Sequence, residues 1–161
     1  MSTHKKELLV RQVILQVREY GISNVLFRNI IADVMGVNIT DVECLGLLFH
    51  KGISTPSELS AYTGLSSGAT TAMLDRLENS GIIERRPNPN DRRGTMISII
   101  QEKAEKLAPL FQSGREAQNQ LVSSYSEEEL ELLTAFLHNL VITMDQERQK
   151  LQTLLSKGLK R

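Results

Sequence analysis

The feature that most constrains the fold is a pair of short helical segments separated by a tight glycine-containing turn. Thr55 is a favourable helix N-cap, Pro56 suits the first helical position, and Glu58 completes a capping box. Gly64 ends this segment, and a longer helix follows and is closed by Gly81. The layout predicts a helix-turn-helix. Five apolar residues are expected to pack the two helices together: Ala61, Leu65, Met73, Leu74 and Leu77.

The hydrophobic period changes directly after the second helix. Residues 82–86 are extended in character, residues 87–91 are rich in turn formers, and residues 95–100 are largely β-branched and roughly alternating. We expect two strands joined by a polar loop, which form a wing. The predicted fold class is therefore mainly α with a small β-hairpin wing (α+β), a winged helix-turn-helix.

Amphipathic helices flank this motif. Residues 9–24 repeat apolar positions every three or four residues over about five turns. A second helix is predicted to begin at a capping box formed by Thr40 and Glu43, and to stop near Gly52. The C-terminal third is predicted to be helical over 102–123, with possible bends at Pro109 and Gly114. A further helix follows a capping box that Ser126 and Glu129 form.

The flanking helices carry apolar faces that a motif of roughly 60 residues cannot easily cover. Packing within one chain would explain either face, whereas a two-fold dimer would explain both and would match a palindromic DNA site. We expect residues 1–38 and 101–161 to form a helical dimerisation region and residues 39–100 to form the DNA-binding region.

Positive charge is concentrated in the wing of a chain whose 19 basic and 19 acidic residues give it no net charge. The segment from Arg85 to Arg93 holds four arginines and one acid, Asp91, a charge of +3 in nine residues. A solvated hairpin tip would explain the charge alone. The position after the helix-turn-helix favours arginines that meet phosphates or enter a minor groove.

The second helix of the motif begins with small polar residues, which let the backbone approach DNA closely. Ser66 or Ser67 is also expected to cap the helix. Arg76 is the only cation in this helix, and two roles remain open for it: a phosphate contact or pairing with Asp75 or Glu78. The candidate DNA-binding residues are Ser66, Ser67, Gly68, Thr70, Thr71, Arg76, Arg86, Asp91, Arg92 and Arg93.

Residues 55–99 resemble the MarR (multiple antibiotic resistance regulator) family. The resemblance is carried by Asp75-Arg76-Leu77-Glu78, Gly81-Ile82 and, most specifically, Asn90-Asp91-Arg92-Arg93-Gly94, and the flanking helices occur in the family's order. It implies a homodimeric regulator whose winged lobes enter major grooves, and a small aromatic or acidic effector.

Carried onto this chain, the resemblance makes Arg93 the minor-groove arginine and Asp91 the residue that orients it. Two positions depart from the family pattern: Asn88 stands where many members have Asp, and Ala72 stands where many have a basic or polar residue. The second departure favours phosphate and shape recognition over direct base contacts. It also leaves open a protein-interaction adaptor that does not bind DNA.

Other classes of protein find little support in the sequence. The chain has no run of 18 apolar residues and no secretory signal, so we expect a cytoplasmic protein without a membrane partner. His4, His50 and His138 are far apart, and Cys44 is the single cysteine, so we expect no enzyme, no cofactor and no metal site. Cys44 is expected to be a buried hydrophobe, with a redox-sensing variant as the alternative.

Overall fold

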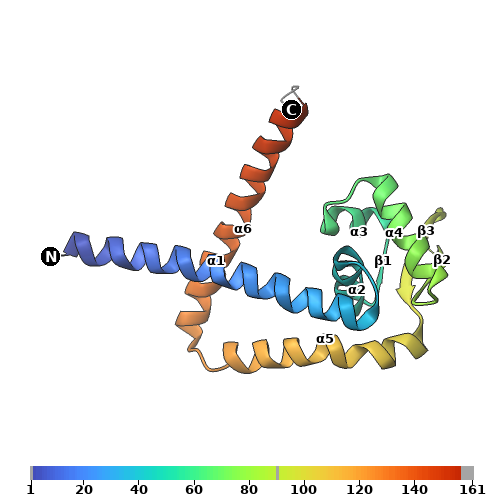
Figure 1. The fold of residues 1–161 in the computed structure, drawn as a ribbon, viewed down its shortest axis with the longest axis horizontal. Coiled ribbons are helices and arrows are strands. Elements are labelled where there is room, and N and C mark those ends of the chain that lie inside the picture. Colours follow the sequence, from blue (N-terminus) through green and yellow to red (C-terminus); the bar gives the residue numbers. More distant parts are fainter. Residues whose placement is uncertain (1, 90, 157–161) are drawn as a thin grey trace. The chain divides into compact units, whose positions relative to one another are not determined.

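The computed structural model describes residues 2–89 and 91–156, with the side chains at positions 2, 3, 91–93 and 156 outside that description. The chain divides into two compact units, Met1–Gln112 and Ser113–Arg161. The first unit contains the predicted winged helix-turn-helix, and Figure 1 shows its helices and strands in chain order. The fold class expected from the sequence is confirmed.

Helix α1 (Ser2–Met35) is longer than the predicted 9–24. It ends at Gly36, whose φ of 66° lies in the left-handed region that favours glycine. The Val37 N–H donates to the Ala32 carbonyl at 3.0 Å, which closes the last turn. Ile31 and Ala32 are buried against Val42 of the next helix, so the C-terminal end of α1 joins the core of the first unit (Figure 1).

Helix α2 (Ile39–Lys51) begins two residues earlier than the sequence indicates. The predicted capping box of Thr40 and Glu43 is wrong. Asn38 is the N-cap, and Asp41 three residues later accepts its N–H through Oδ2 at 3.1 Å. The Glu43 carboxylate, which was expected to reach back to the cap, instead pairs with Arg28 of α1. The predicted stop is confirmed, since the Gly52 N–H donates to the Leu48 carbonyl at 2.7 Å.

Helices α3 (Pro56–Thr63) and α4 (Ser67–Asn79) form the predicted helix-turn-helix. The Thr55 capping box is confirmed, and Gly64 ends α3 in the left-handed conformation with φ of 70°. Met73, Leu74 and Leu77 of α4 are buried as expected. Ala61 is exposed and was wrongly assigned to this interface. The buried residue of α3 is Leu59, which joins the same core.

The wing belongs to a three-stranded antiparallel sheet. Strands β1 (Ile53–Ser54), β2 (Ile83–Asn88) and β3 (Asp91–Ile99) lie in the order β1-β3-β2. The sequence did not predict β1, because a strand of two residues has no detectable period. Pro87 was expected in the loop but lies in β2 opposite Thr95. Proline is tolerated there because β2 is an edge strand. No further strand lies on its outer side to need a hydrogen bond from the missing N–H.

The core of the first unit lies between α2, α3, α4 and the sheet. Its buried members are Cys44, Leu45, Leu48, Leu59, Met73, Leu74, Leu77, Ile82, Ile83 and Ile97. The first part of helix α5 (Gln101–Val122) closes this core, because Phe111 stacks on Phe49 of α2 with ring centroids 4.7 Å apart. Helix α5 is continuous through Pro109 and Gly114.

The second unit consists of the end of α5 and helix α6 (Glu127–Ser156). The capping box predicted before α6 is confirmed. The Ser126 N–H donates to Glu129 Oε2 at 2.8 Å, and the Glu129 N–H donates to Ser126 Oγ at 3.3 Å. Large apolar side chains of α6 are exposed: Leu132, Leu133, Phe136, Leu137, Val141, Ile142, Met144, Leu151, Leu154 and Leu155.

Candidate nucleic-acid interface

The N-terminal turn of α4 presents a small, polar surface to solvent. Ser66 caps the helix, and its Oγ accepts the Ala69 N–H at 3.3 Å, so the predicted cap is confirmed. Ser67, Gly68 and Thr71 are all exposed. The Thr71 hydroxyl donates to the Ser67 carbonyl at 3.0 Å. Small side chains at the N-terminus of a helix leave the backbone open to an approaching anion.

Thr70 differs from its neighbours on this turn. Its side chain is 2% exposed, and its hydroxyl donates to the Ser66 carbonyl at 2.9 Å. The sequence placed Thr70 among the surface contacts because hydroxyl residues surround it. In the structure it lies on the core side of α4, where it closes the first turn.

Arg76 lies further along α4 and pairs with an acidic residue of another helix. Its Nη2 lies 2.8 Å from Oδ1 of Asp41 on α2. The Asp41 side chain is 3% exposed and that of Arg76 is 47% exposed. Of the two roles left open for Arg76, the structure does not show the pairing with Asp75 or Glu78, because both of those carboxylates pair with Arg85. Sequence reasoning missed Asp41 as a partner because 35 residues separate the two side chains.

Arg85 of β2 forms a bridge between the wing and α4. Its Nη2 lies 2.6 Å from Asp75 Oδ1, and its Nη1 lies 2.5 Å from Glu78 Oε2. Asp75 and Glu78 are three residues apart and share one face of the helix, which matches the two-pronged guanidinium. The charge of Arg85, which the sequence counted towards the basic wing, is therefore neutralised by acidic residues of α4.

Arg86 is the exposed cation of β2. Its side chain is 62% exposed, and it pairs with Glu84 of the same strand. The backbone of Asp91, Arg92 and Arg93 lies in β3, but the side chains of these three predicted residues lie outside the described part of the chain.

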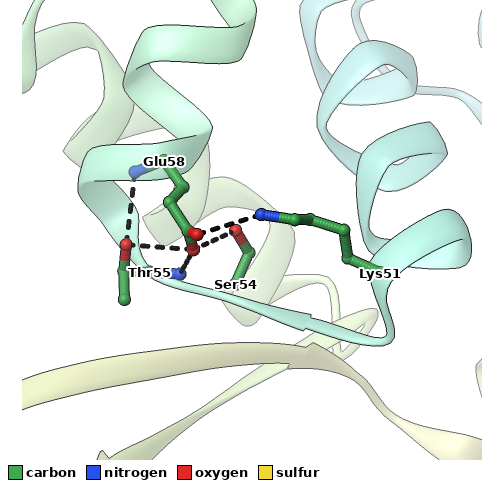
Figure 2. A network of polar contacts seen from close by, with 4 residues as sticks. All are labelled: Lys51, Ser54, Thr55 and Glu58. Carbon is green, nitrogen blue, oxygen red and sulfur yellow. Dashed lines mark hydrogen bonds and ion pairs between the residues drawn. The ribbon is translucent and has the colours of Figure 1, made fainter.

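A polar network fixes the start of α3 (Figure 2). Glu58 Oε2 accepts the Thr55 N–H and the Ser54 hydroxyl, each at 2.8 Å, while Oε1 accepts from Lys51 Nζ at 2.9 Å. These bonds, led by the one from the Thr55 backbone, lower the pKa of Glu58 to about 2. Glu58 thus joins the end of α2, strand β1 and the first turn of α3. The sequence indicated only the capping part of this network.

Cys44 lies in the core of α2 and is fully buried. Burial, with a smaller contribution from the charge of Asp41, raises the pKa of its thiol to about 12. A thiol that stays protonated at neutral pH is a poor nucleophile. This environment favours the packing role over the redox-sensing alternative.

Neither a metal-binding cluster nor a membrane-spanning helix occurs in the described part of the chain. Among the side chains that the structure describes, no group of three or more His, Cys, Asp or Glu could hold a metal ion. Within residues 2–89 and 91–156, no helix has the length and apolarity needed to cross a membrane.

Comparisons with known proteins agree with this architecture. The sequence model described as "MarR family" matches residues 37–95. The chain is 34% identical over 153 residues to the uncharacterized HTH-type transcriptional regulator YcgE of Bacillus subtilis, covering 94% of this chain and 99% of YcgE. It is 31% identical over 108 residues to the multiple antibiotic resistance protein MarR of Salmonella typhimurium, covering 66% of this chain and 75% of that protein.

Solved structures show the same fold. A mutant of MarR from E. coli, complexed with operator DNA, has a TM-score of 0.53 and 25% sequence identity, covering 80% of this chain and 95% of that one. A MarR family protein from Bacillus stearothermophilus has a TM-score of 0.62 and 19% identity, covering 86% of this chain and 97% of that one. The chain belongs to the MarR family and is a DNA-binding transcriptional regulator.

Proposed function

We propose that this protein is a homodimeric repressor that binds a palindromic operator in double-stranded DNA. The observation that carries the proposal is the exposed N-terminal turn of α4, which is tied to the wing through Arg85. The second helix of a helix-turn-helix binds in the major groove through its exposed N-terminal residues. A basic hairpin on the same lobe can then contact the flanking phosphates. The E. coli MarR structure with operator DNA supports the same use of the fold.

The proposed contacts follow from the exposed residues of this surface. Ser66, Ser67, Gly68 and Thr71 approach the major groove through hydroxyl and backbone groups. Thr70 supports this turn from the core side. Ala72 is exposed and apolar, so the helix offers few side chains that read base edges. Phosphate contacts and DNA shape therefore contribute a large share of the affinity.

Arginines supply the proposed phosphate and minor-groove contacts. Arg76 and Arg86 have substantial exposed surface for phosphates. Arg92 and Arg93 lie at the start of β3, and we assign Arg93 to the minor groove with Asp91 orienting it, as the family resemblance implies. A neutral protein whose positive charge is clustered locally, as in the segment from Arg85 to Arg93, binds DNA through that cluster without coating it.

The apolar faces of the terminal helices support the dimer. Val10, Ile14 and Leu26 of α1 are exposed, as are Leu137 and Val141 of α6. Exposed apolar faces on long helices are normally covered by a partner. We propose that residues 1–38 and 101–161 form the dimerisation region and residues 39–100 the DNA-binding region. One two-fold axis would then relate both the protomers and the operator half-sites.

The remaining parts of the proposal rest on the family. We place the protein in the cytoplasm, assign it no enzymatic activity, and propose a small aromatic or acidic effector that releases the operator. The adaptor alternative is not favoured, since the relatives are transcriptional regulators.

A selection of genomic DNA fragments with the purified full chain tests the function. We expect enrichment of one palindromic sequence, with an affinity that falls steeply as salt rises because bound counterions are released. Sedimentation should show a dimer at micromolar concentration. Failure to enrich any sequence, together with the absence of salt-dependent DNA binding, would contradict the proposal and favour the adaptor.

A further inference from the structure

We propose that Asp41 is a positioning residue for DNA binding, which holds Arg76 in the geometry in which Arg76 binds a phosphate. The inference rests on the proposed function and adds to the same site a residue that does not itself touch DNA. Asp41 belongs to α2, whereas Arg76 belongs to the proposed recognition helix α4.

The carboxylate of Asp41 is buried and bonded on both oxygens. Oδ2 accepts the Asn38 N–H at 3.1 Å, and Oδ1 accepts from Arg76 Nη2 at 2.8 Å. A buried charge is retained only where partners compensate for its lost hydration. The first bond fixes the carboxylate to the start of α2, so the second bond gives Arg76 an immobile anchor.

Arg76 keeps exposed surface while it is anchored. Its side chain is 47% exposed, and a guanidinium has five N–H donors in one plane. A bond from Nη2 to a fixed acceptor sets the direction of the whole plane. The conformational entropy that a free arginine loses on binding is then already lost before DNA arrives.

The sequence of α4 makes this arginine important. Ala69, Ala72 and Arg76 are three or four residues apart and share a helical stripe, and both alanines are exposed. Arg76 is the only cation of α4. Because Ala72 supplies no basic side chain, this stripe depends on Arg76 for any charge-assisted contact with phosphate.

Two effects of Asp41 on phosphate binding oppose each other. Its negative charge weakens the attraction of Arg76 for a phosphate, whereas its anchoring lowers the entropic cost of the contact. If charge dominated, removal of the carboxylate charge would strengthen DNA binding. Our proposal requires the opposite sign, because the Asp41 charge is already compensated by hydrogen bonds to both of its oxygens, while its bond to Nη2 directs Arg76 towards the phosphate.

Asp41→Asn tests the sign with a nearly isosteric side chain. The affinity of the full-length dimer for the duplex enriched from genomic DNA, or for mixed genomic duplex if none is enriched, is measured by fluorescence anisotropy over a salt series. We expect roughly tenfold weaker binding, and a slope of log K against log salt that falls by about one for each protomer bound. A loss of folded protein alone would lower the active fraction and leave the slope unchanged.

Glu43→Gln is the matched control. It removes one negative charge from the same helix and breaks an ion pair with Arg28 of α1, without touching α4. Affinity and salt slope should both equal those of the wild type. A second control is the Arg76→Gln background, in which Asp41→Asn should cause no further loss.

Three results would overturn the positioning role. The first is that Asp41→Asn binds DNA as tightly as the wild type, or more tightly. The second is that Asp41→Asn weakens binding as much in the Arg76→Gln background as in the wild type. The third is that Glu43→Gln weakens binding as much as Asp41→Asn does. If circular dichroism shows that Asp41→Asn is unfolded, nitrogen-15 NMR of the wild type tests whether the Arg76 side chain is held in place. Resolved, slowly rotating Nη signals of Arg76 are expected, and rotationally averaged signals would overturn the role.

The outcome also separates this inference from the proposed function. Absence of salt-dependent binding of any duplex by the wild type would overturn both. Normal wild-type binding with an unchanged Asp41→Asn variant would overturn only the positioning role.

Discussion

Arg85 Nη1 of the wing strand lies 2.5 Å from Glu78 Oε2 near the end of α4. The same guanidinium reaches Asp75, so one side chain from β2 pairs with two carboxylates of α4. The orientation of the wing relative to α4 is thus set inside the protein, before either element meets DNA.

Arg85→Gln should therefore lower both stability and DNA affinity. Partly exposed ion pairs contribute little each, so we expect a loss of about 1 kcal/mol in the free energy of unfolding, measured by urea titration. Arg86→Gln is the control, since Arg86 pairs only within its own strand among the contacts of the described residues. It should weaken DNA binding with a change in stability of less than ~0.5 kcal/mol. Equal stability of the two variants would contradict the bridge.

Gly68→Ala should affect stability and DNA binding in opposite directions. A Cβ at position 68 would meet no atom within 4 Å, and Gly68 does not have a positive φ. Alanine should stabilise the helix by up to about 1 kcal/mol, but its methyl group would obstruct close approach of the α4 backbone to DNA.

Gly46→Ala serves as the control for this change. It lies within α2, where a Cβ would make an ordinary contact of 3.8 Å with Phe111. Operator affinity, measured by anisotropy, should fall for Gly68→Ala and remain unchanged for Gly46→Ala. Undiminished binding by Gly68→Ala would remove this turn from the interface.

Glu58→Gln should remove part of the acid sensitivity of the fold. The folded-state pKa of Glu58 is lowered to about 2 from an ordinary 4.5, so the unfolded chain takes up this proton first as pH falls. Its stabilisation is complete above pH 4.5 and is lost as pH falls towards 2. Glu58→Gln should be less stable than the wild type at pH 7, and the difference should shrink on acidification. Chemical denaturation at several pH values measures it, and a constant difference would contradict the network.

Cys44 should resist thiol reagents in the folded protein. Burial raises its pKa to about 12, so the thiolate that reacts is scarce at neutral pH. A chromogenic disulfide reagent should modify Cys44 only at the rate of unfolding, and completely in urea. Cys44→Ala provides the unreactive baseline. Rapid stoichiometric modification of the native protein would support the redox-sensing alternative.

The sequence predicted the features that depend on local signals. Capping boxes at Thr55 and Ser126, the glycine stops at Gly52 and Gly64, and the alternating wing strands all rest on residues within a few positions of each other. The family resemblance then supplied the regulator class.

Features that depend on long-range contacts were missed. No spacing in the sequence indicates that Asp41 of α2 pairs with Arg76 of α4. Strand β1 has two residues and exists through its pairing with β3. Thr70 belongs to a hydroxyl-rich turn, and only the packing of α4 shows that it is buried. Sequence spacing alone does not encode such contacts.

The affinity of wild type and Arg93→Ala for the enriched palindrome, measured by anisotropy across a salt series, tests the central claim most directly. The wild type should bind as a dimer with a steep salt dependence. Arg93→Ala should lose about 1–3 kcal/mol of binding free energy if Arg93 makes the specific contact that we assign to it. A flat salt response of the wild type would contradict DNA recognition by this surface, and an unchanged Arg93→Ala affinity would contradict the role of the wing.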